Sequence, residues 1–194
     1  MALRVGIFGG TFNPIHLGHL LLAETARDAL SLDRVLFIPT GRPPHKAAPG
    51  LVSGAARLRM VRLAIRDHPG FAASDVELQR PGLSYSIETV QAVRRAMPGA
   101  KLFLLIGADL LNVRWAAWNE LKRLCTVVAV RRPGARPARR EAGIHRLDMP
   151  LVKISSSDIR ARVAAGGSIR YLVPPAVERY IRQHQLYRSP AGAS

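Results

Sequence analysis

The stretch VGIFGGTFNPIHLGH, residues 5–19, decides how this chain is organised. Residues 5–8 are apolar or small, which is typical of a strand buried on both faces of a sheet, and Gly9 and Gly10 end that strand. Because glycine has no Cβ, the backbone of the turn can approach a bulky ligand closely. Pro14 has the fixed φ suited to a first helical turn, so we expect a helix from about residue 14 to about residue 30.

Two histidines, His16 and His19, lie three residues apart at the start of that expected helix. At this spacing both imidazoles project from one face, near a helix N-terminus whose free N–H groups favour an anion. The pattern predicts a phosphate site with two added donors. A zinc half-site is the alternative, but zinc needs further ligands, and the only cysteine is Cys125, inside an apolar run. Neither a P-loop nor a dinucleotide fingerprint is present.

Composition predicts one globular domain. The chain has 194 residues, of which 48% are hydrophobic, so we expect a domain over residues 1–188 and a frayed tail over residues 189–194. A single cysteine excludes an internal disulfide framework and is compatible with a reducing cytoplasm. The opening MALRVGIFGG indicates a strand rather than a signal peptide, and no run is long enough to cross a bilayer. We therefore expect a soluble, cytoplasmic protein with no membrane partner.

The charge is strongly positive, at a formal +16, with 29 Lys and Arg against 13 Asp and Glu. Such a field attracts nucleic acid, an acidic membrane surface or phosphorylated substrates. The loop RRPGARPARR, residues 131–140, is either solvated surface or a phosphate clamp. A basic nucleic-acid-binding protein is thus an alternative, but the chain lacks the interleaved aromatics that stack on bases, so we expect no specific nucleic-acid partner.

Strand and helix patterns alternate along the chain. Further strands are expected at residues 34–38, 74–78, 101–106, 125–130 and 151–154, and an amphipathic helix with a solvated arginine face at residues 55–67. The alternation predicts an α/β fold with a doubly wound parallel sheet. Polar motifs follow these strands directly, so they should gather at the carboxyl edge, where such sheets bind ligands. These motifs are GGTFNP, PTGRPPHK, SYS, GAD, RRPG and ISSSDIR.

Several of these residues keep two interpretations on sequence alone. Ser84 is a reasonable helix N-cap. Asp109 can accept hydrogen bonds from ribose hydroxyls or cap a helix. One of Trp115 and Trp118 can stack on a planar ring while the other is core. The serines at residues 155–157 can cap a helix or bind a second anion.

The sequence His16-Leu17-Gly18-His19 resembles the H-x-G-H signature of adenylyltransferases. The ordered set GGTFNPIHLGH, PPHK, SYSIET, IGAD, WAAWNEL, RRPG, ISSSDIR and IRYLVPPAVERYI resembles the bacterial nicotinate-mononucleotide adenylyltransferases across nearly the whole chain. This resemblance implies a single-domain, Rossmann-like nucleotidyltransferase fold. It also implies adenylyl transfer from ATP to nicotinate mononucleotide in NAD biosynthesis, by direct in-line attack, giving deamido-NAD and pyrophosphate with Mg²⁺ on the triphosphate. Nicotinamide mononucleotide and phosphopantetheine remain alternative acceptors, and a homo-oligomer is compatible with the sequence.

The resemblance also assigns residues. It implies catalytic roles for His16 and His19, with His19 stabilising the transition state. The remaining residues implied to bind ATP are Gly9, Gly10, Thr11, Gly107, Asp109, Ser156, Ser157 and Arg160. Those implied to bind the mononucleotide are Lys46, Ser84, Tyr85, Ser86, Trp115 and Arg132. Asn13 stands where many members of the family have Asp, which removes a charge near the phosphates.

Overall fold

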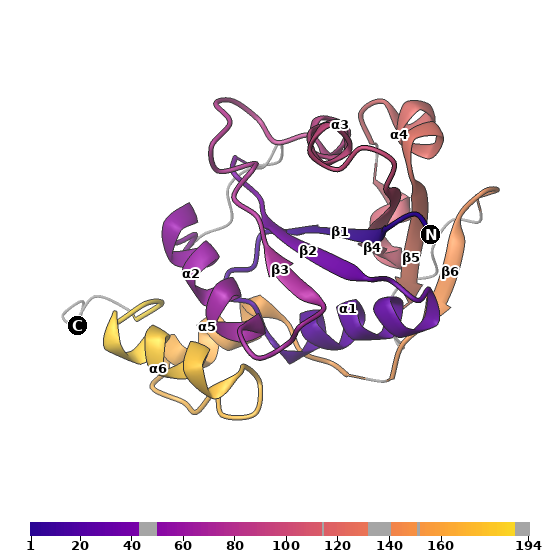
Figure 1. Cartoon of the computed structure of the whole chain (residues 1–194). Helices are drawn as coiled ribbons and strands as arrows, with labels where there is room; N and C mark the ends of the chain where they lie inside the picture. The colour runs from indigo at the N-terminus through magenta and orange to yellow at the C-terminus, as the bar shows by residue number, and fades with distance from the viewer. Residues whose placement is uncertain (43–49, 114, 132–140, 151, 189–194) are drawn as a thin grey trace.

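The computed structural model describes residues 1–42, 50–113, 115–131, 141–150 and 152–188. Within these residues six parallel strands form one sheet in the order β3-β2-β1-β4-β5-β6 (Figure 1). The chain moves outward from β1 to β3 and then crosses back to β4, so the sheet is doubly wound, as the sequence predicts. The strands are β1 (Arg4–Gly10), β2 (Arg34–Pro39), β3 (Phe71–Ala73), β4 (Lys101–Gly107), β5 (Thr126–Arg131) and β6 (His145–Asp148).

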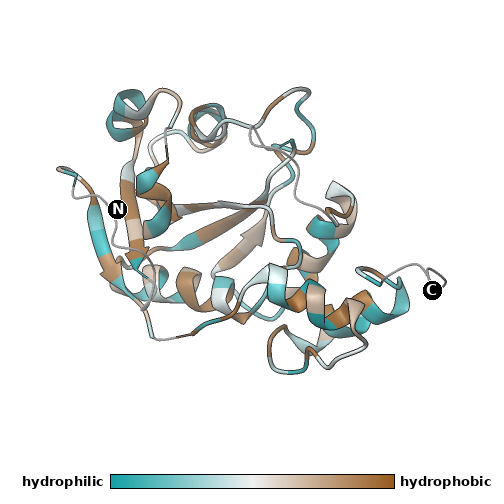
Figure 2. Cartoon of the chain, turned by 180° about the vertical axis from the view of Figure 1, so that it is seen from behind, coloured by the Kyte–Doolittle hydropathy of each residue, from teal (hydrophilic) through white to brown (hydrophobic). Residues whose placement is uncertain are grey.

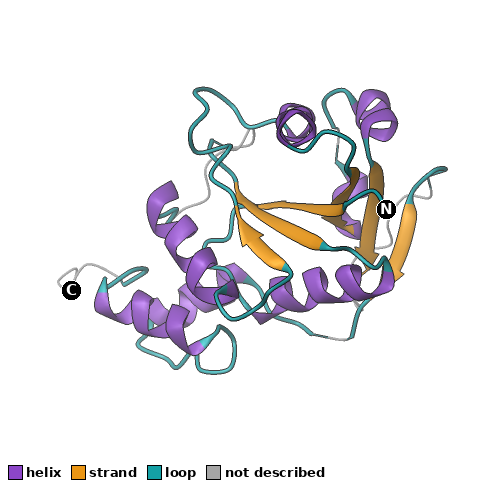
Figure 3. Cartoon of the chain, in the orientation of Figure 1, coloured by secondary structure: helices purple, strands orange, loops and turns teal. Residues whose placement is uncertain are grey.

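Helices cover both faces of the sheet, which makes three layers. In Figure 3, α3 and α4 lie on one side of the strands and α1 and α2 on the other. Figure 1 places α5 and α6 on the side of α1 and α2. The helices are α1 (Leu17–Ala29), α2 (Gly54–Ile65), α3 (Ser86–Ala96), the 3-10 helix η1 (Ala108–Asn112), α4 (Trp118–Leu124), α5 (Ser156–Ala164) and α6 (Pro175–Gln183).

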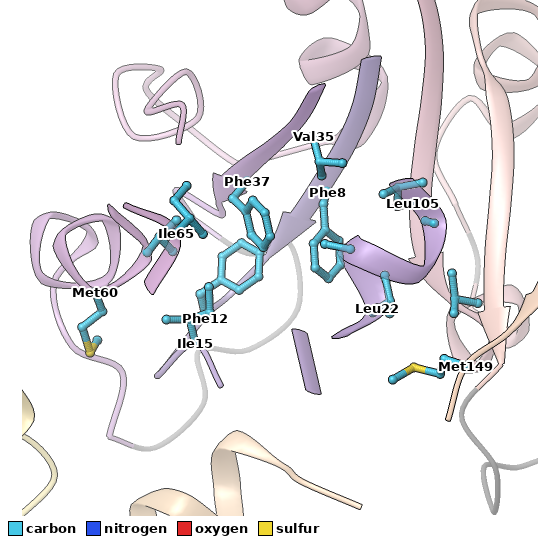
Figure 4. Packing of buried hydrophobic residues seen from close by; sticks show 14 of the residues in the cluster. Phe8, Phe12, Ile15, Leu22, Val35, Phe37, Met60, Ile65, Leu105 and Met149 are labelled. Atoms are coloured by element: carbon cyan, nitrogen blue, oxygen red, sulfur yellow. The ribbon is translucent and has the colours of Figure 1, made fainter. Parts of the chain in front are cut away.

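Alternate residues of the central strands supply two hydrophobic cores. Phe8 faces the α1 side and Ile7 faces the α3 side, and the same alternation along β4 assigns Leu105 to the first core and Leu104 to the second. In Figure 4 the rings of Phe8, Phe12 and Phe37 gather in the first core, with centroids 5.4–5.9 Å apart. Figure 2 shows both brown and teal segments along the helices, as expected of amphipathic helices that bury one face.

The parallel register aligns the strand ends that lead into the polar motifs. Gly10 pairs with Pro39, and Gly107 pairs with Val130, so the chain leaves β1, β2, β4 and β5 at one edge. The strand order changes direction between β1 and β4. A sheet of this kind leaves a crevice outside the carboxyl ends of the strands at such a switch point.

Two expected elements differ in position. The first helix begins at Leu17 rather than near Pro14, because the backbone of His16 is extended, with φ −146° and ψ 171°. The third strand is Phe71–Ala73 and not residues 74–78. Ser74 donates its backbone N–H to the Phe37 carbonyl at 3.0 Å, and a turn closed by Leu78 N–H to the Asp75 carbonyl follows at 2.8 Å. The apolar residues of 74–78 therefore lie in a turn.

The last strand is also displaced. It is β6, His145–Asp148, whereas the described residues 152–154 of the expected strand have no regular structure. β6 is an edge strand and three of its four residues are exposed, so it has no apolar run to reveal it. Ile154 packs against the first core without pairing to a strand, which explains the misleading apolar pattern.

No helix in the described residues is both long enough and apolar enough to span a bilayer. The expected tail, residues 189–194, lies outside the described residues.

Candidate functional site

Gly9 and Gly10 are the last two residues of β1, paired with Ile38 and Pro39, and together with the residues that follow them they form what we call the glycine turn. This turn is open on one side and packed on the other. A Cβ built on Gly9 meets no protein atom within 4 Å, whereas one on Gly10 would lie 2.9 Å from the Phe12 ring. Phe12 itself is 1% exposed and holds a positive φ of 47°, which turns the chain sharply. Gly10 thus makes room for a core phenylalanine, and Gly9 leaves open space for a ligand.

The histidine pair lies together at the start of α1. The rings of His16 and His19 stack with centroids 3.7 Å apart, so the expectation that both imidazoles share one face is confirmed. His16 is the N-cap residue and is 2% exposed, while His19 is half-buried against Phe12, with ring centroids 5.0 Å apart. A Cβ on Gly18 would lie 3.1 Å from Nδ1 of His16. The glycine between the two histidines therefore leaves room for the buried His16 ring.

His19 is oriented by the backbone of its partner. The N–H of His16 donates to Nδ1 of His19 at 3.3 Å. Because Nδ1 accepts this bond, the neutral imidazole carries its proton on Nε2. The arrangement supplies a ring donor at Nε2 beside the turn.

The carbonyl groups of the turn are held by side chains from distant helices. Ser156 Oγ donates to the Pro14 carbonyl, and Nη1 of Arg160 donates to the Asn13 carbonyl, each at 2.9 Å. These bonds join residues 142 and 147 positions apart and bring the serine-led helix α5 against the glycine turn. They also occupy acceptor oxygens that would otherwise repel an anion near the turn.

The start of α5 shows which residue of the serine run caps the helix. Ser155 is the N-cap, and its Oγ accepts a hydrogen bond from the N–H of Asp158 at 3.1 Å. Ser157 is exposed and accepts from Nη2 of Arg160 at 3.4 Å. The cap is therefore Ser155, and the polar groups of Ser156, Ser157 and Arg160 lie at the helix start next to the turn.

Arg57 corrects the expectation of a solvated arginine face on α2. Arg59, Arg62 and Arg66 are exposed, but Arg57 is 2% exposed. Its Nη1 donates to the Thr11 carbonyl at 2.9 Å and its Nε to the Val52 carbonyl at 3.2 Å. Burial lowers the pKa of this guanidinium, and the charges of Tyr187 and Glu77 act in the opposite direction. The periodicity of α2 gave no reason to separate this arginine from its neighbours.

The side chain of Asn13 ties the turn to two other segments. Its Nδ2 donates to the Gly50 carbonyl at 3.0 Å, while its Oδ1 accepts from Val52 N–H at 3.3 Å and from the Tyr187 hydroxyl at 2.9 Å. The residue is 2% exposed. A carboxylate could accept from Val52 and Tyr187 but could not donate to Gly50, so this neutral side chain meets a donor requirement that Asp would leave unmet.

A cavity of about 690 Å³ opens on the other side of the turn. Its wall includes Gly9, Gly10 and Thr11 from the end of β1, the entrance of α3, and the segment after β4. The predicted mononucleotide residues Ser84, Tyr85, Ser86 and Trp115 all line it, together with Thr40, Glu77, Leu104, Leu105, Ile106, Leu110, Val113 and Ala116. The cavity therefore unites two motif groups that are separated by more than seventy positions in the sequence.

Ser84 is not the helix cap that the sequence suggested. The N-cap of α3 is Tyr85, and the buried Ser84 Oγ accepts from the backbone N–H groups of Gly41 and Arg42 at 3.1 and 3.2 Å. Ser84 thus joins the loop after β2 to the entrance of α3. Tyr85 is 36% exposed and lies at the cavity wall.

Both tryptophans are partly buried against the second core, and only Trp115 lines the cavity. Trp115 lines the cavity and donates its Nε1 hydrogen to the Leu110 carbonyl at 2.7 Å. Trp118 lies behind it, with ring centroids 5.3 Å apart, and its Nε1 donates to Glu141, which Lys122 also contacts at 3.0 Å. Trp115 is the indole available to a ligand in the cavity, while Trp118 supports it.

The remaining predicted residues lie either outside the cavity lining or outside the described residues. Gly107 ends β4, and Asp109 is exposed in the first turn of η1, but neither lines the cavity. His16, His19, Ser156, Ser157 and Arg160 also lie outside its lining and meet the turn from the α1 side. Lys46 and Arg132, with most of the loop 131–140, are outside the described residues.

Three polar residues of this region are not predicted as site residues from the sequence: Arg57, Glu77 and Tyr187. Arg57 and Glu77 are at most 5% exposed, and Tyr187 is partly buried. Burial raises the pKa of the Tyr187 phenol, whose hydroxyl reaches Asn13 from near the end of the chain. The sequence around each residue is typical of an ordinary helix or loop, so only the tertiary contacts show that these side chains belong to the site region.

Comparisons with known proteins agree with this geometry. Residues 7–162 match the family model described as cytidylyltransferase-like. The probable nicotinate-nucleotide adenylyltransferase of Synechococcus sp. (strain JA-3-3Ab) is 46% identical to the chain, and the match covers 96% of each protein. That of Shouchella clausii (strain KSM-K16) is 47% identical, and the match covers 95% of this chain and 96% of the relative. The solved nicotinic acid mononucleotide adenylyltransferase of Plasmodium falciparum, complexed with NaAD, has the same fold, with a TM-score of 0.79 and 16% identity over 95% of this chain and 97% of that one. The chain therefore belongs to the cytidylyltransferase-like family and, within it, to the nicotinate-nucleotide adenylyltransferases.

Proposed function

We propose that the chain carries out its family's reaction at the glycine turn and the cavity beside it. Adenylyl is transferred from ATP to nicotinate mononucleotide, giving deamido-NAD and pyrophosphate, a step of NAD biosynthesis. The observation that carries this proposal is the pair of hydrogen bonds from α5 to the Pro14 and Asn13 carbonyls, which bring the donors assigned to ATP phosphates against the cavity wall assigned to the mononucleotide.

The chemistry is a single displacement at phosphorus. A phosphate oxygen of the mononucleotide attacks the α-phosphorus of ATP, a P–O bond forms, and the bond to the pyrophosphate oxygen breaks in line. Negative charge builds on the equatorial and leaving oxygens. His19, with its proton on Nε2, donates to one of these oxygens, and His16 supports it by stacking and by orienting Nδ1. No covalent intermediate with the protein is needed.

Two regions divide the binding of the substrates. The ATP phosphates contact the open backbone at Gly9, the histidines, and the polar start of α5, while Asp109 accepts from the adenosine ribose. The pyridine ring occupies the cavity against Trp115, with the entrance of α3 offering backbone N–H groups to the nicotinate carboxylate. Lys46 and Arg132 stay predicted ligands of the mononucleotide phosphate.

Mg²⁺ enters as part of the MgATP substrate. The described residues contain no group of three or more His, Cys, Asp or Glu side chains that could hold a metal ion. The side chains against the turn are amide, hydroxyl, imidazole and guanidinium groups, which suit phosphate oxygens better than a hard cation. We propose that the triphosphate oxygens and water coordinate the ion.

The proposal is tested by incubating purified protein with MgATP and each acceptor in turn, and measuring pyrophosphate and the dinucleotide product. We expect kcat/KM to be highest with nicotinate mononucleotide, lower with nicotinamide mononucleotide and lowest with phosphopantetheine. Absence of product with every acceptor, or a clear preference for phosphopantetheine, contradicts the proposal. Binding to RNA or DNA that disappears at moderate salt would reflect charge alone. The cytoplasmic location also remains a prediction, supported by the single buried cysteine.

A further inference from the structure

Glu77 is a buried carboxylate in the wall of the substrate cavity. It lies in the turn after β3, is 5% exposed, and lines the cavity together with Ser84, Tyr85 and Trp115. Its Oε1 accepts a hydrogen bond from Thr89 Oγ1 at 2.6 Å, which fixes the carboxylate against the first turn of α3. Its Oε2 is buried and has no hydrogen-bond partner among the described residues.

A buried carboxylate with one unpartnered oxygen is costly in the free protein. Carboxylate charge is tolerated in an interior when a donor or a cation faces it. The cation that interacts with Glu77 is Arg57, but this guanidinium gives its Nη1 and Nε hydrogens to the carbonyls of Thr11 and Val52. No ion pair joins the two side chains in the described part of the chain. Among the described residues, no donor or cation completes the pairing of this carboxylate.

The acceptor substrate brings such a partner. In a pyridine mononucleotide the ring nitrogen is bonded to ribose, so the aromatic ring carries a full positive charge. Trp115 in the same cavity presents an aromatic surface, which also attracts a cationic ring. A negative group and an indole in one cavity together favour a flat cation over a neutral ring of the same shape.

We propose that Glu77 is a further acceptor-binding residue, whose carboxylate pairs with the positive charge of the pyridinium ring in the cavity. The inference rests on the proposed function and adds a basis for selecting the oxidised ring. A dihydropyridine mononucleotide, which has the same ribose and phosphate but an uncharged ring, should bind poorly for this reason.

The test compares two acceptors and three proteins. Wild type, Glu77→Gln and Asp75→Asn are each assayed with oxidised and with reduced (dihydropyridine) nicotinate mononucleotide. Glu77→Gln keeps an oxygen to accept from Thr89 and removes only the charge. Asp75 is the matched control, because it lines a neighbouring cavity and not this one, and accepts from Gln79 Nε2 at 3.2 Å.

We expect Glu77→Gln to raise KM for the oxidised acceptor by roughly tenfold and to leave KM for the reduced acceptor nearly unchanged. Asp75→Asn should change neither. The proposal is overturned if Glu77→Gln raises KM equally for both acceptors, or raises it for neither. Activity of the wild type with the oxidised acceptor tests the proposed function separately. If a thermal melt shows that Glu77→Gln is poorly folded, the wild-type protein alone provides the test. A KM about tenfold lower for the oxidised than for the reduced acceptor supports charge pairing, and equal KM values overturn it.

Discussion

At the scale of single residues, the ring of His19 is held on its Nδ1 side and on both of its faces. The N–H of His16 occupies its Nδ1, and the rings of Phe12 and His16 pack on its faces at centroid distances of 5.0 and 3.7 Å. A donor that is already oriented needs no reorganisation when charge develops on the transferring phosphoryl group. The catalytic contribution of this residue should therefore be separable from its contribution to folding.

Substituting His19→Ala should lower kcat on the order of 10²-fold, because one transition-state donor is lost. Steady-state kinetics with saturating substrates measure the effect, and circular dichroism checks that the variant is folded. His145→Ala, at an exposed position on β6, is the control and should behave like wild type. Turnover close to wild type in His19→Ala would count against the proposed mechanism.

Cys125 lies outside the described site, and its burial should make stability depend on pH in the alkaline range. It is 7% exposed, and its Sγ donates to the Leu121 carbonyl at 3.3 Å. Burial raises the pKa of the thiol from 9.0 to about 11, with a backbone hydrogen bond from Leu104 acting in the opposite direction. Below pH 9 both folded and unfolded chains keep the proton, so the stabilising difference is fully present there.

As the pH rises from 9 to about 11, the unfolded chain loses the thiol proton before the folded chain does, so stability falls. The loss attributable to Cys125 should be on the order of 2 kcal/mol by pH 11. Urea unfolding of wild type and Cys125→Ala at several pH values isolates it, because other groups titrate alike in both. Parallel pH profiles for the two proteins would exclude this linkage.

At the scale of elements, the glycine turn is positioned from outside its own segment. α2 reaches the Thr11 carbonyl through Arg57, and α5 reaches the Pro14 and Asn13 carbonyls through Ser156 and Arg160. Hydrogen bonds to charged donors are stronger than neutral ones, so these helices constrain the turn firmly. Ligand geometry at the turn thus depends on packing far along the chain.

Arg57→Met should lower kcat/KM for ATP about tenfold or more, because a small displacement of the turn misplaces the phosphate contacts. Its effect on stability should be smaller, since removing a costly buried charge offsets part of the loss of two hydrogen bonds. Kinetics and thermal melts on the same preparations separate the two effects. Arg59→Met, an exposed position on α2, is the control, and matching kinetics for both variants would show that Arg57 does not position the turn.

Elements with strong local signals could be predicted from the sequence. β4 is apolar and buried from Leu102 onward, and both the strand and its glycine end are where the pattern indicates. β6 could not be predicted, since an exposed edge strand of four residues has neither an apolar run nor a periodic face. The N-cap role expected for Ser84 was wrong, because the partners of its hydroxyl, Gly41 and Arg42, lie more than forty positions away in the sequence.

At the scale of the whole molecule, the convergence of the strand ends allowed part of the cavity lining to be predicted from the sequence, but not the residues that support it. Parallel connection alone places Gly9, Ser84 and Trp115 at one edge, and all three line one cavity. The supporting residues Arg57 and Tyr187 depend on how α2 and the final segment pack, which no local pattern encodes. Net charge of +16 contributes a general attraction for phosphorylated substrates and no selectivity.

The most direct measurement is a crystal structure of the protein with its dinucleotide product bound. The pyridine ring should lie in the cavity against Trp115, and the bridging phosphates should contact the backbone at Gly9 and Nε2 of His19. Density for the phosphates away from the glycine turn, or for the ring outside this cavity, would contradict this assignment of the substrate sites.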